Sequence, residues 1–125
     1  MYLGHSITAE NVKYVMADAI PGNSILTDKL VRFGYKELIA ERNNVMCNQG
    51  DTIKCHEFHY SDTDDHGDGF TSVNMRGRIE NTIFVSDTIW AGYPHLHLWG
   101  NPTFADNFVH NCHKYSKHVF LQRRC

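Results

Sequence analysis

Two short segments of this 125-residue chain concentrate histidines at spacings that could support chemistry. Residues 55–61 read CHEFHYS, and residues 93–102 read YPHLHLWGNP. Alternate side chains of a strand face opposite sides, so His95 and His97 would project together while Leu96 and Leu98 point into apolar packing. Because imidazole changes charge near neutral pH and also ligates metals, these segments indicate either proton transfer or metal binding.

Metal binding is the interpretation that needs only the spacing. Two imidazoles on one strand face can share an ion, and Cys55, His56 or His59 could complete such a site. The spacing is not a known zinc signature, and the chain has no C-x-x-C pair. A non-catalytic β-rich module that binds a metal or another subunit therefore stays open as an alternative to an enzyme.

Composition excludes several classes of protein. The net charge is −2, and the 12 Lys and Arg residues form no basic stripe, so we expect no nucleic-acid partner. No apolar run approaches the roughly 18 residues that span a bilayer, and the first residues do not resemble a signal peptide. We expect one domain, no membrane partner, a cytoplasmic location and reduced thiols at the four cysteines.

The elements that must position the histidines are mostly strands. Apolar or alternating segments at 14–20, 30–40, 52–60 and 81–99, separated by turn-forming Pro, Gly and Asn residues, predict short strands. Residues 62–69 predict an acidic surface loop. The loop loosely imitates a calcium site, but Val73 stands where a calcium loop needs a bidentate glutamate.

A helix is predicted over residues 102–117. Asn101 is a good N-cap and Pro102 suits the first helical position. Apolar residues then recur at helical spacing: Phe104, Ala105, Phe108, Val109 and Cys112. We expect this amphipathic helix to pack on the sheet.

Three phrases carry a resemblance to a known family. Residues 32–35 (RFGY), 56–61 (HEFHYS) and 93–102 resemble, in order and spacing, the C-terminal part of the a,c-diamide synthases that amidate cobyrinate, hydrogenobyrinate or related tetrapyrroles. The resemblance covers residues 1–115. It implies an α/β fold in which residues 1–125 form the C-terminal half of a flavodoxin-like class I glutamine amidotransferase domain, a β-rich fragment with a C-terminal helix.

The resemblance also implies a catalytic role for one histidine. In the family a cysteine attacks the amide of glutamine, and a histidine in a Tyr-x-His phrase holds or accepts its proton; that position falls on His95. Many relatives in the wider superfamily carry a glutamate two residues later, where this chain has His97. The orienting carboxylate would then be absent or come from elsewhere, with Glu57 as a candidate. His97 is a further candidate residue of the catalytic site.

The family's nucleophile phrase resembles Cys-Gly-Gly-x-Met-Tyr-Leu-Gly, whose last four residues match residues 1–4. We therefore expect the nucleophile four residues before Met1. We also expect the synthetase domain, which binds ATP and Mg²⁺, to lie outside this chain. The chain by itself would then bind no cofactor and be inactive. The implied partners are glutamine, a tetrapyrrole and, as a separate chain, the missing first half; a homo-oligomer is a further option. None of the four cysteines of the chain would then be the nucleophile; they are Cys47, Cys55, Cys112 and Cys125.

Overall fold

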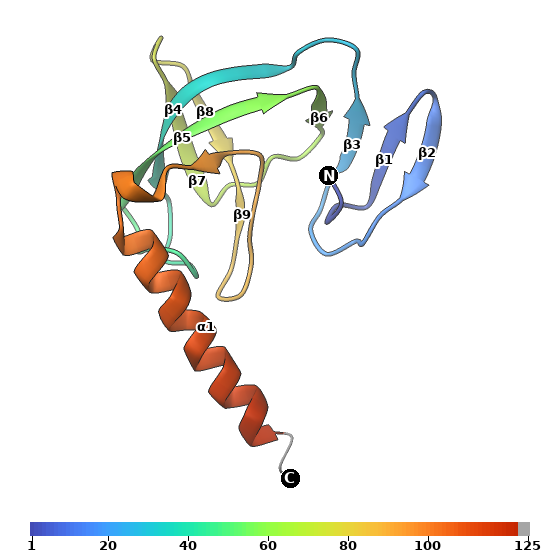
Figure 1. The fold of residues 1–125 in the computed structure, drawn as a ribbon. Helices are drawn as coiled ribbons and strands as arrows, with labels where there is room; N and C mark the ends of the chain where they lie inside the picture. Colours follow the sequence, from blue (N-terminus) through green and yellow to red (C-terminus); the bar gives the residue numbers. More distant parts are fainter. Residues whose placement is uncertain (123–125) are drawn as a thin grey trace.

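A computed structural model describes residues 1–122, which form strands and two helical segments (Figure 1). The strands are β1 (Ser6–Ala9), β2 (Val12–Val15), β3 (Asn23–Leu26), β4 (Arg32–Ala40), β5 (Thr52–His59), β6 (Ser61–Thr63), β7 (Phe70–Asn74), β8 (Ile79–Thr82), β9 (Phe84–Val85), β10 (Trp90–Ala91) and β11 (His95–Leu96). A 3₁₀ turn, η1 (Leu98–Gly100), precedes the helix α1 (Thr103–Gln122). Cys125 lies outside the described residues.

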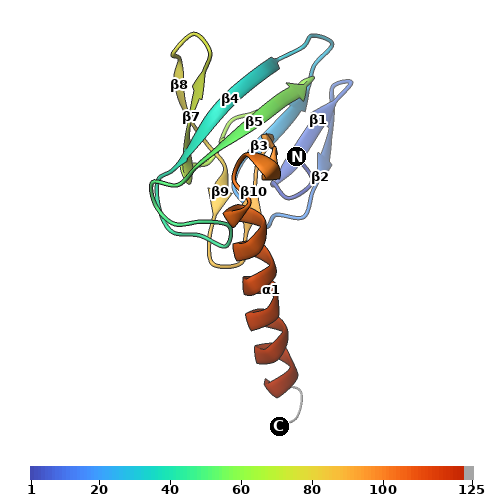
Figure 2. The same ribbon diagram turned by 60° about the vertical axis from the view of Figure 1, so that its left-hand side comes forward.

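The strands form three sheets. A five-stranded antiparallel sheet has the order β11-β5-β4-β7-β8, and a four-stranded sheet has the order β2-β1-β3-β6. Strands β9 and β10 form a separate antiparallel pair. The two larger sheets lie side by side in both views, and the chain passes from one to the other between β5 and β6 (Figures 1 and 2).

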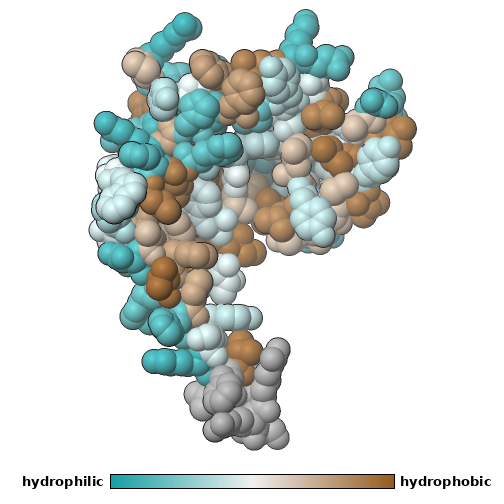
Figure 3. Space-filling view, in the orientation of Figure 1, coloured by the Kyte–Doolittle hydropathy of each residue, from teal (hydrophilic) through white to brown (hydrophobic). Residues whose placement is uncertain are grey.

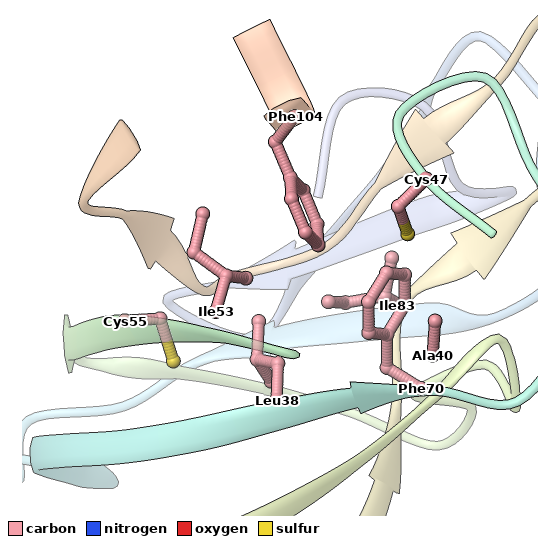
Figure 4. Packing of buried hydrophobic residues seen from close by; sticks show 8 residues of the cluster. All are labelled: Leu38, Ala40, Cys47, Ile53, Cys55, Phe70, Ile83 and Phe104. Atoms are coloured by element: carbon pink, nitrogen blue, oxygen red, sulfur yellow. The ribbon is translucent and has the colours of Figure 1, made fainter. Parts of the chain in front are cut away.

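The core lies on one face of the five-stranded sheet. Alternation along β4 and β5 buries Leu38, Ile53 and Cys55 at 2% exposure or less, while Lys54 between the last two is exposed. Phe70 of β7 and Phe104 of α1 meet at a ring-centroid distance of 6.5 Å. Figure 4 shows the cluster: Leu38, Ala40, Cys47, Ile53, Cys55, Phe70, Ile83 and Phe104.

Most predicted strands are confirmed. Strand β4 lies within residues 30–40 and β5 within residues 52–60, and a strand-rich mixed α/β chain with one C-terminal helix is what the structure shows. In segment 14–20 only the first residues belong to a strand, β2. The predicted loop 62–69 begins inside strand β6, and Asp64 accepts hydrogen bonds from the backbone and side-chain nitrogens of Asn23 at 2.6 and 3.0 Å.

The helix prediction is correct in position and wrong in packing. Helix α1 begins one residue later and ends five residues later than predicted. Only its first turn enters the core, through Phe104; Phe108 is 46% and Tyr115 62% exposed. Asn107 and Asn111 donate to the backbone carbonyl oxygens of residues 46 and 45, which ties the early helix to that loop. Beyond these contacts α1 extends away from the strands, with apolar side chains at its surface (Figures 2 and 3).

Within residues 1–122, no helix combines the length and the apolar character that crossing a bilayer requires.

Candidate functional site

His95 lies on the edge strand of the five-stranded sheet. Strand β11 contains only His95 and Leu96, and pairs antiparallel with β5 through His95 opposite His56 and Leu96 opposite Cys55. Pro94 is buried directly before the strand. Since proline lacks a backbone donor, an edge or strand end is where it is tolerated. The register places the exposed His95 on the side away from the core.

On this outer face His95 contacts His56, which in turn contacts two aromatic side chains. The His56 and His95 rings are 6.5 Å apart between centroids and form an edge contact. Tyr35 lies 5.1 Å and Phe33 5.7 Å from His56, and both are 70% exposed. The site is therefore an aromatic surface on which His95 is exposed and His56 half-buried.

Glu57 lies on the opposite face from His95. It is adjacent to His56 in β5, so alternation turns its side chain toward the core, where it is 2% exposed. Its carboxylate pairs with the Lys36 ammonium at 2.7 Å, and both side chains are nearly buried. The structure does not bring Glu57 and His95 together, so a role for Glu57 in orienting the imidazole gains no support from the geometry.

His97 leaves the strand. It precedes η1, is exposed, and its backbone nitrogen donates to the carbonyl oxygen of Lys54 at 3.0 Å. The prediction that Leu98 packs inward is wrong, because Leu98 begins η1 and is 42% exposed; Leu96 does pack against the core. His95 and His97 thus do not share one regular strand face.

The inner face carries a charged network next to the core. The Glu80 carboxylate accepts from Arg32 and from the Lys36 ammonium at 3.3 Å, and it pairs with Arg78 at 2.9 Å. The hydrogen bond from Arg32 is the main cause that lowers the pKa of Glu80 to about 2. This network joins β4, β5 and β8, and it stabilises the sheet that holds β11.

The described cysteines are poorly suited to act as nucleophiles with His95. Burial raises the pKa of the Cys47 thiol and of the Cys55 thiol to about 11, and the nearby Glu57 charge adds to the effect at Cys55. Such thiols are almost wholly protonated at neutral pH, and the thiolate is the nucleophile. Cys55 pairs with Leu96 on the core face, and Cys112 is an exposed residue of α1.

A cavity of about 300 Å³ is lined by residues that precede strand β11 in the chain and by the N-terminal segment. Its lining includes residues 1–4 and residues 90–93, together with Pro21 and Phe84. Residues 1–4 are those that match the end of the family's nucleophile phrase. The fold therefore brings this N-terminal segment and the residues before His95 to the same cavity.

A stacked pair of rings that the sequence patterns did not predict lies close to the site in the chain. The rings of His59 and Tyr93 lie 4.0 Å apart and 16° from parallel. Strict alternation along β5, anchored on the apolar Ile53, would have placed His59 and Glu57 on the inner face and separated them from His56. Among residues 1–122, no group of three or more His, Cys, Asp or Glu side chains is arranged to hold a metal ion.

Comparison with known proteins gives a consistent family. The chain is similar to cobyrinate a,c-diamide synthases: 32% identical over 120 residues to that of Thermoplasma volcanium (94% of this chain, 26% of the relative). The corresponding values for Picrophilus torridus are 33% over 113 residues (90% and 24%). The chain thus spans about a quarter of the length of these curated relatives. No solved structure gives a significant match.

A family match covers most of the described residues. Residues 1–103 match the CobB/CobQ-like glutamine amidotransferase domain, a region that includes every strand and η1. Helix α1 begins where the match ends. The chain therefore belongs to the family of CobB/CobQ-like glutamine amidotransferase domains.

Proposed function

We propose that this chain supplies the histidine of a glutaminase site in an ATP- and glutamine-dependent a,c-diamide synthase acting on cobyrinate or a related tetrapyrrole. The family match and the relatives' names support the reaction class. The observation that carries the proposal is the position of His95, exposed on an edge strand directly after residues that share a cavity with residues 1–4. We also propose that the chain is part of a flavodoxin-like domain. Strands β1 and β3 pair in parallel, and further parallel strands of such a sheet would be added to this pair.

In the proposed reaction, a cysteine thiolate from outside this chain attacks the side-chain amide carbon of glutamine. The His95 imidazole accepts the thiol proton and donates it to the departing nitrogen, so ammonia leaves and a thioester forms. Water then hydrolyses the thioester to glutamate and restores the thiol. Ammonia displaces phosphate from a carboxylate that ATP, bound with Mg²⁺ in a separate domain, has activated, and an amide results.

The proposal takes the cysteine from outside the described residues, and the burial of two of the described thiols supports this choice. Cys47 and Cys55 are buried with pKa values raised to about 11, and Cys55 is on the face opposite His95. The minor candidates have less support than His95, because Glu57 is paired with Lys36 on the inner face and His97 lies outside the strand.

The test uses this chain alone and with a partner. Purified 1–125 should release no ammonia from glutamine. Addition of a polypeptide carrying the cysteine-bearing remainder of the amidotransferase domain should produce ammonia release, and the same mixture made with His95→Ala should not. His97→Ala is the matched control and should retain most of the activity. Ammonia release by the chain alone that depends on one of its own cysteines would contradict the proposal.

A further inference from the structure

We infer that His59, Ser61 and Tyr93 form a clamp that positions His95, which makes them positioning residues for the proposed glutaminase site. The inference rests on the proposed function for its catalytic meaning, while the clamp itself is a statement about geometry. Its central contact is the stacking of Tyr93 on His59, with centroids 4.0 Å apart and planes within 16°. Such a close parallel contact fixes the plane of Tyr93 against the end of β5.

Hydrogen bonds fix the same two rings in their own planes. The buried Ser61 hydroxyl donates to the Tyr93 phenol oxygen at 3.0 Å. Nδ1 of His59 lies 2.7 Å from the Ser61 carbonyl oxygen. Since a carbonyl oxygen can only accept, Nδ1 must carry the proton, and one residue holds both members of the stack.

The protonation state of His59 suits stacking rather than proton transfer. Its Nε2 atom is buried and has no hydrogen-bond partner among the described residues. Burial lowers the pKa of His59, so the neutral ring with a proton on Nδ1 is favoured near neutral pH. His59 therefore acts in the clamp as a flat, oriented surface for Tyr93.

The clamp acts on His95 through a short and stiff connection. Only Pro94, which is buried, separates Tyr93 from His95, and the pyrrolidine ring restricts the backbone at that point. Strand β11 itself is two residues long and pairs with β5 on one side only. Because so short an edge strand is weakly held, the fixed Tyr93 ring is what sets where the His95 imidazole projects.

The residues of the HEFHYS segment (56–61) have different roles with respect to His95. His56 faces the site and contacts His95, whereas His59 and Ser61 hold the segment that carries His95 from the other side of the sheet. Tyr93 also borders the cavity shared with residues 1–4. The clamp thus sets the direction of the His95 imidazole and fixes Tyr93, which borders the cavity.

The first test measures the position of His95 in the 1–125 chain by NMR. Tyr93→Leu removes the stack and should shift the His95 ring resonances and weaken the nuclear Overhauser contact between the His56 and His95 rings. Tyr93→Phe keeps the stack and should largely restore both. Tyr115→Leu, on the exposed part of α1, is the matched control and should change neither. Should Tyr93→Leu unfold the chain, Ser61→Ala is the milder substitution, with smaller shifts in the same resonances.

The second test measures catalysis in the whole synthase that carries this segment. Tyr93→Leu should lower glutamine-driven kcat about tenfold to a hundredfold, since a misplacement near 1 Å can have that effect. Ammonia-driven amidation should stay unchanged, which a general structural defect would not allow, and Tyr93→Phe should rescue the glutamine-driven rate.

Unchanged His95 resonances in both folded Tyr93→Leu and folded Ser61→Ala would overturn the clamp. Equal loss of glutamine-driven and ammonia-driven activity in Tyr93→Leu would also overturn it. If His95→Ala leaves glutamine-driven activity intact while Tyr93→Leu still shifts the His95 resonances, the proposed function fails and the clamp stands.

Discussion

The two faces of the five-stranded sheet are built for different purposes. The inner face combines a fully buried apolar core, including Leu38 and Phe70, with the nearly buried Lys36–Glu57 ion pair. The outer face exposes Phe33 and Tyr35 around the contacting imidazoles of His56 and His95. Both faces come from the same strands, because alternate residues of β4 and β5 project to opposite sides.

The difference shows how one short phrase can serve stability and chemistry together. Within HEFHYS, Glu57 and His59 belong to the inner face, while His56 belongs to the outer face. Inside, the Glu57 carboxylate is paired with Lys36 and Nδ1 of His59 is hydrogen-bonded to Ser61, whereas on the outer face His95 is exposed and His56 half-buried. We therefore expect substitutions in the inner-face core and ion pair to change the free energy of unfolding, and substitutions of the outer-face imidazoles to change activity.

The largest expected effect is the difference in free energy of unfolding between substitutions at two phenylalanines. Phe70→Ala should lower the free energy of unfolding of the chain by about 3–5 kcal/mol, because it opens a cavity in the core. Phe33→Ala makes the same chemical change at a side chain that is 70% exposed, and should cost less than about 1 kcal/mol. Urea unfolding followed by far-UV circular dichroism measures both. Similar costs at the two positions would remove the contrast between the faces.

The next effect compares two glutamates. Glu57→Ala leaves the nearly buried Lys36 without its closest partner, and we expect a loss of about 3 kcal/mol, since breaking a buried pair is costly. Glu37 is exposed on the outer face of β4, so Glu37→Ala should change the free energy of unfolding by less than about 0.5 kcal/mol. Urea midpoints at pH 7 test the pair. A Glu57→Ala protein as stable as Glu37→Ala would show that the inner charges do not support the sheet.

A smaller expected effect concerns the stability of the fold at acidic pH. The pKa of Glu80 is lowered to about 2 in the fold, mainly by Arg32, so its charged form stabilises the native state. This contribution is present above the ordinary carboxyl pKa of about 4.5 and is lost as the pH falls from there toward 2. The stability difference between the wild type and Glu80→Gln should be about 1–2 kcal/mol at pH 7 after allowance for solvent screening, and should shrink below pH 4.5. A difference independent of pH would contradict this role.

Sequence patterns were sufficient for the elements with strong local signals. Alternation located β4 and β5, and Pro102 after Asn101 located the start of α1 to within one residue. The helix packing could not be derived, because an amphipathic stripe does not say whether a partner surface lies within reach. Among the helix side chains whose burial the structure describes, Phe104 alone is fully buried, and Phe108 remains exposed.

For the candidate site, the sequence proposed a central residue, His95, but did not predict the residues around it. The resemblance pointed to His95, but the partner of His95 across the edge strand depends on register between segments about forty residues apart, which gives His56 rather than Glu57. The stacking of Tyr93 on His59 likewise depends on how two sheets meet at the end of β5. These are tertiary arrangements, and local sequence patterns do not specify them.

The central claim is that His95, on the outer face, serves glutamine hydrolysis. The most direct measurement compares glutamine-driven with ammonia-driven amidation by the whole synthase carrying His95→Ala, with His56→Ala and His97→Ala as comparisons. We predict that His95→Ala lowers the glutamine-driven rate by about 10²- to 10⁴-fold, as loss of a general acid–base does, and leaves the ammonia-driven rate unchanged. Equal loss with both nitrogen sources, or no loss with glutamine, would contradict the role proposed for His95.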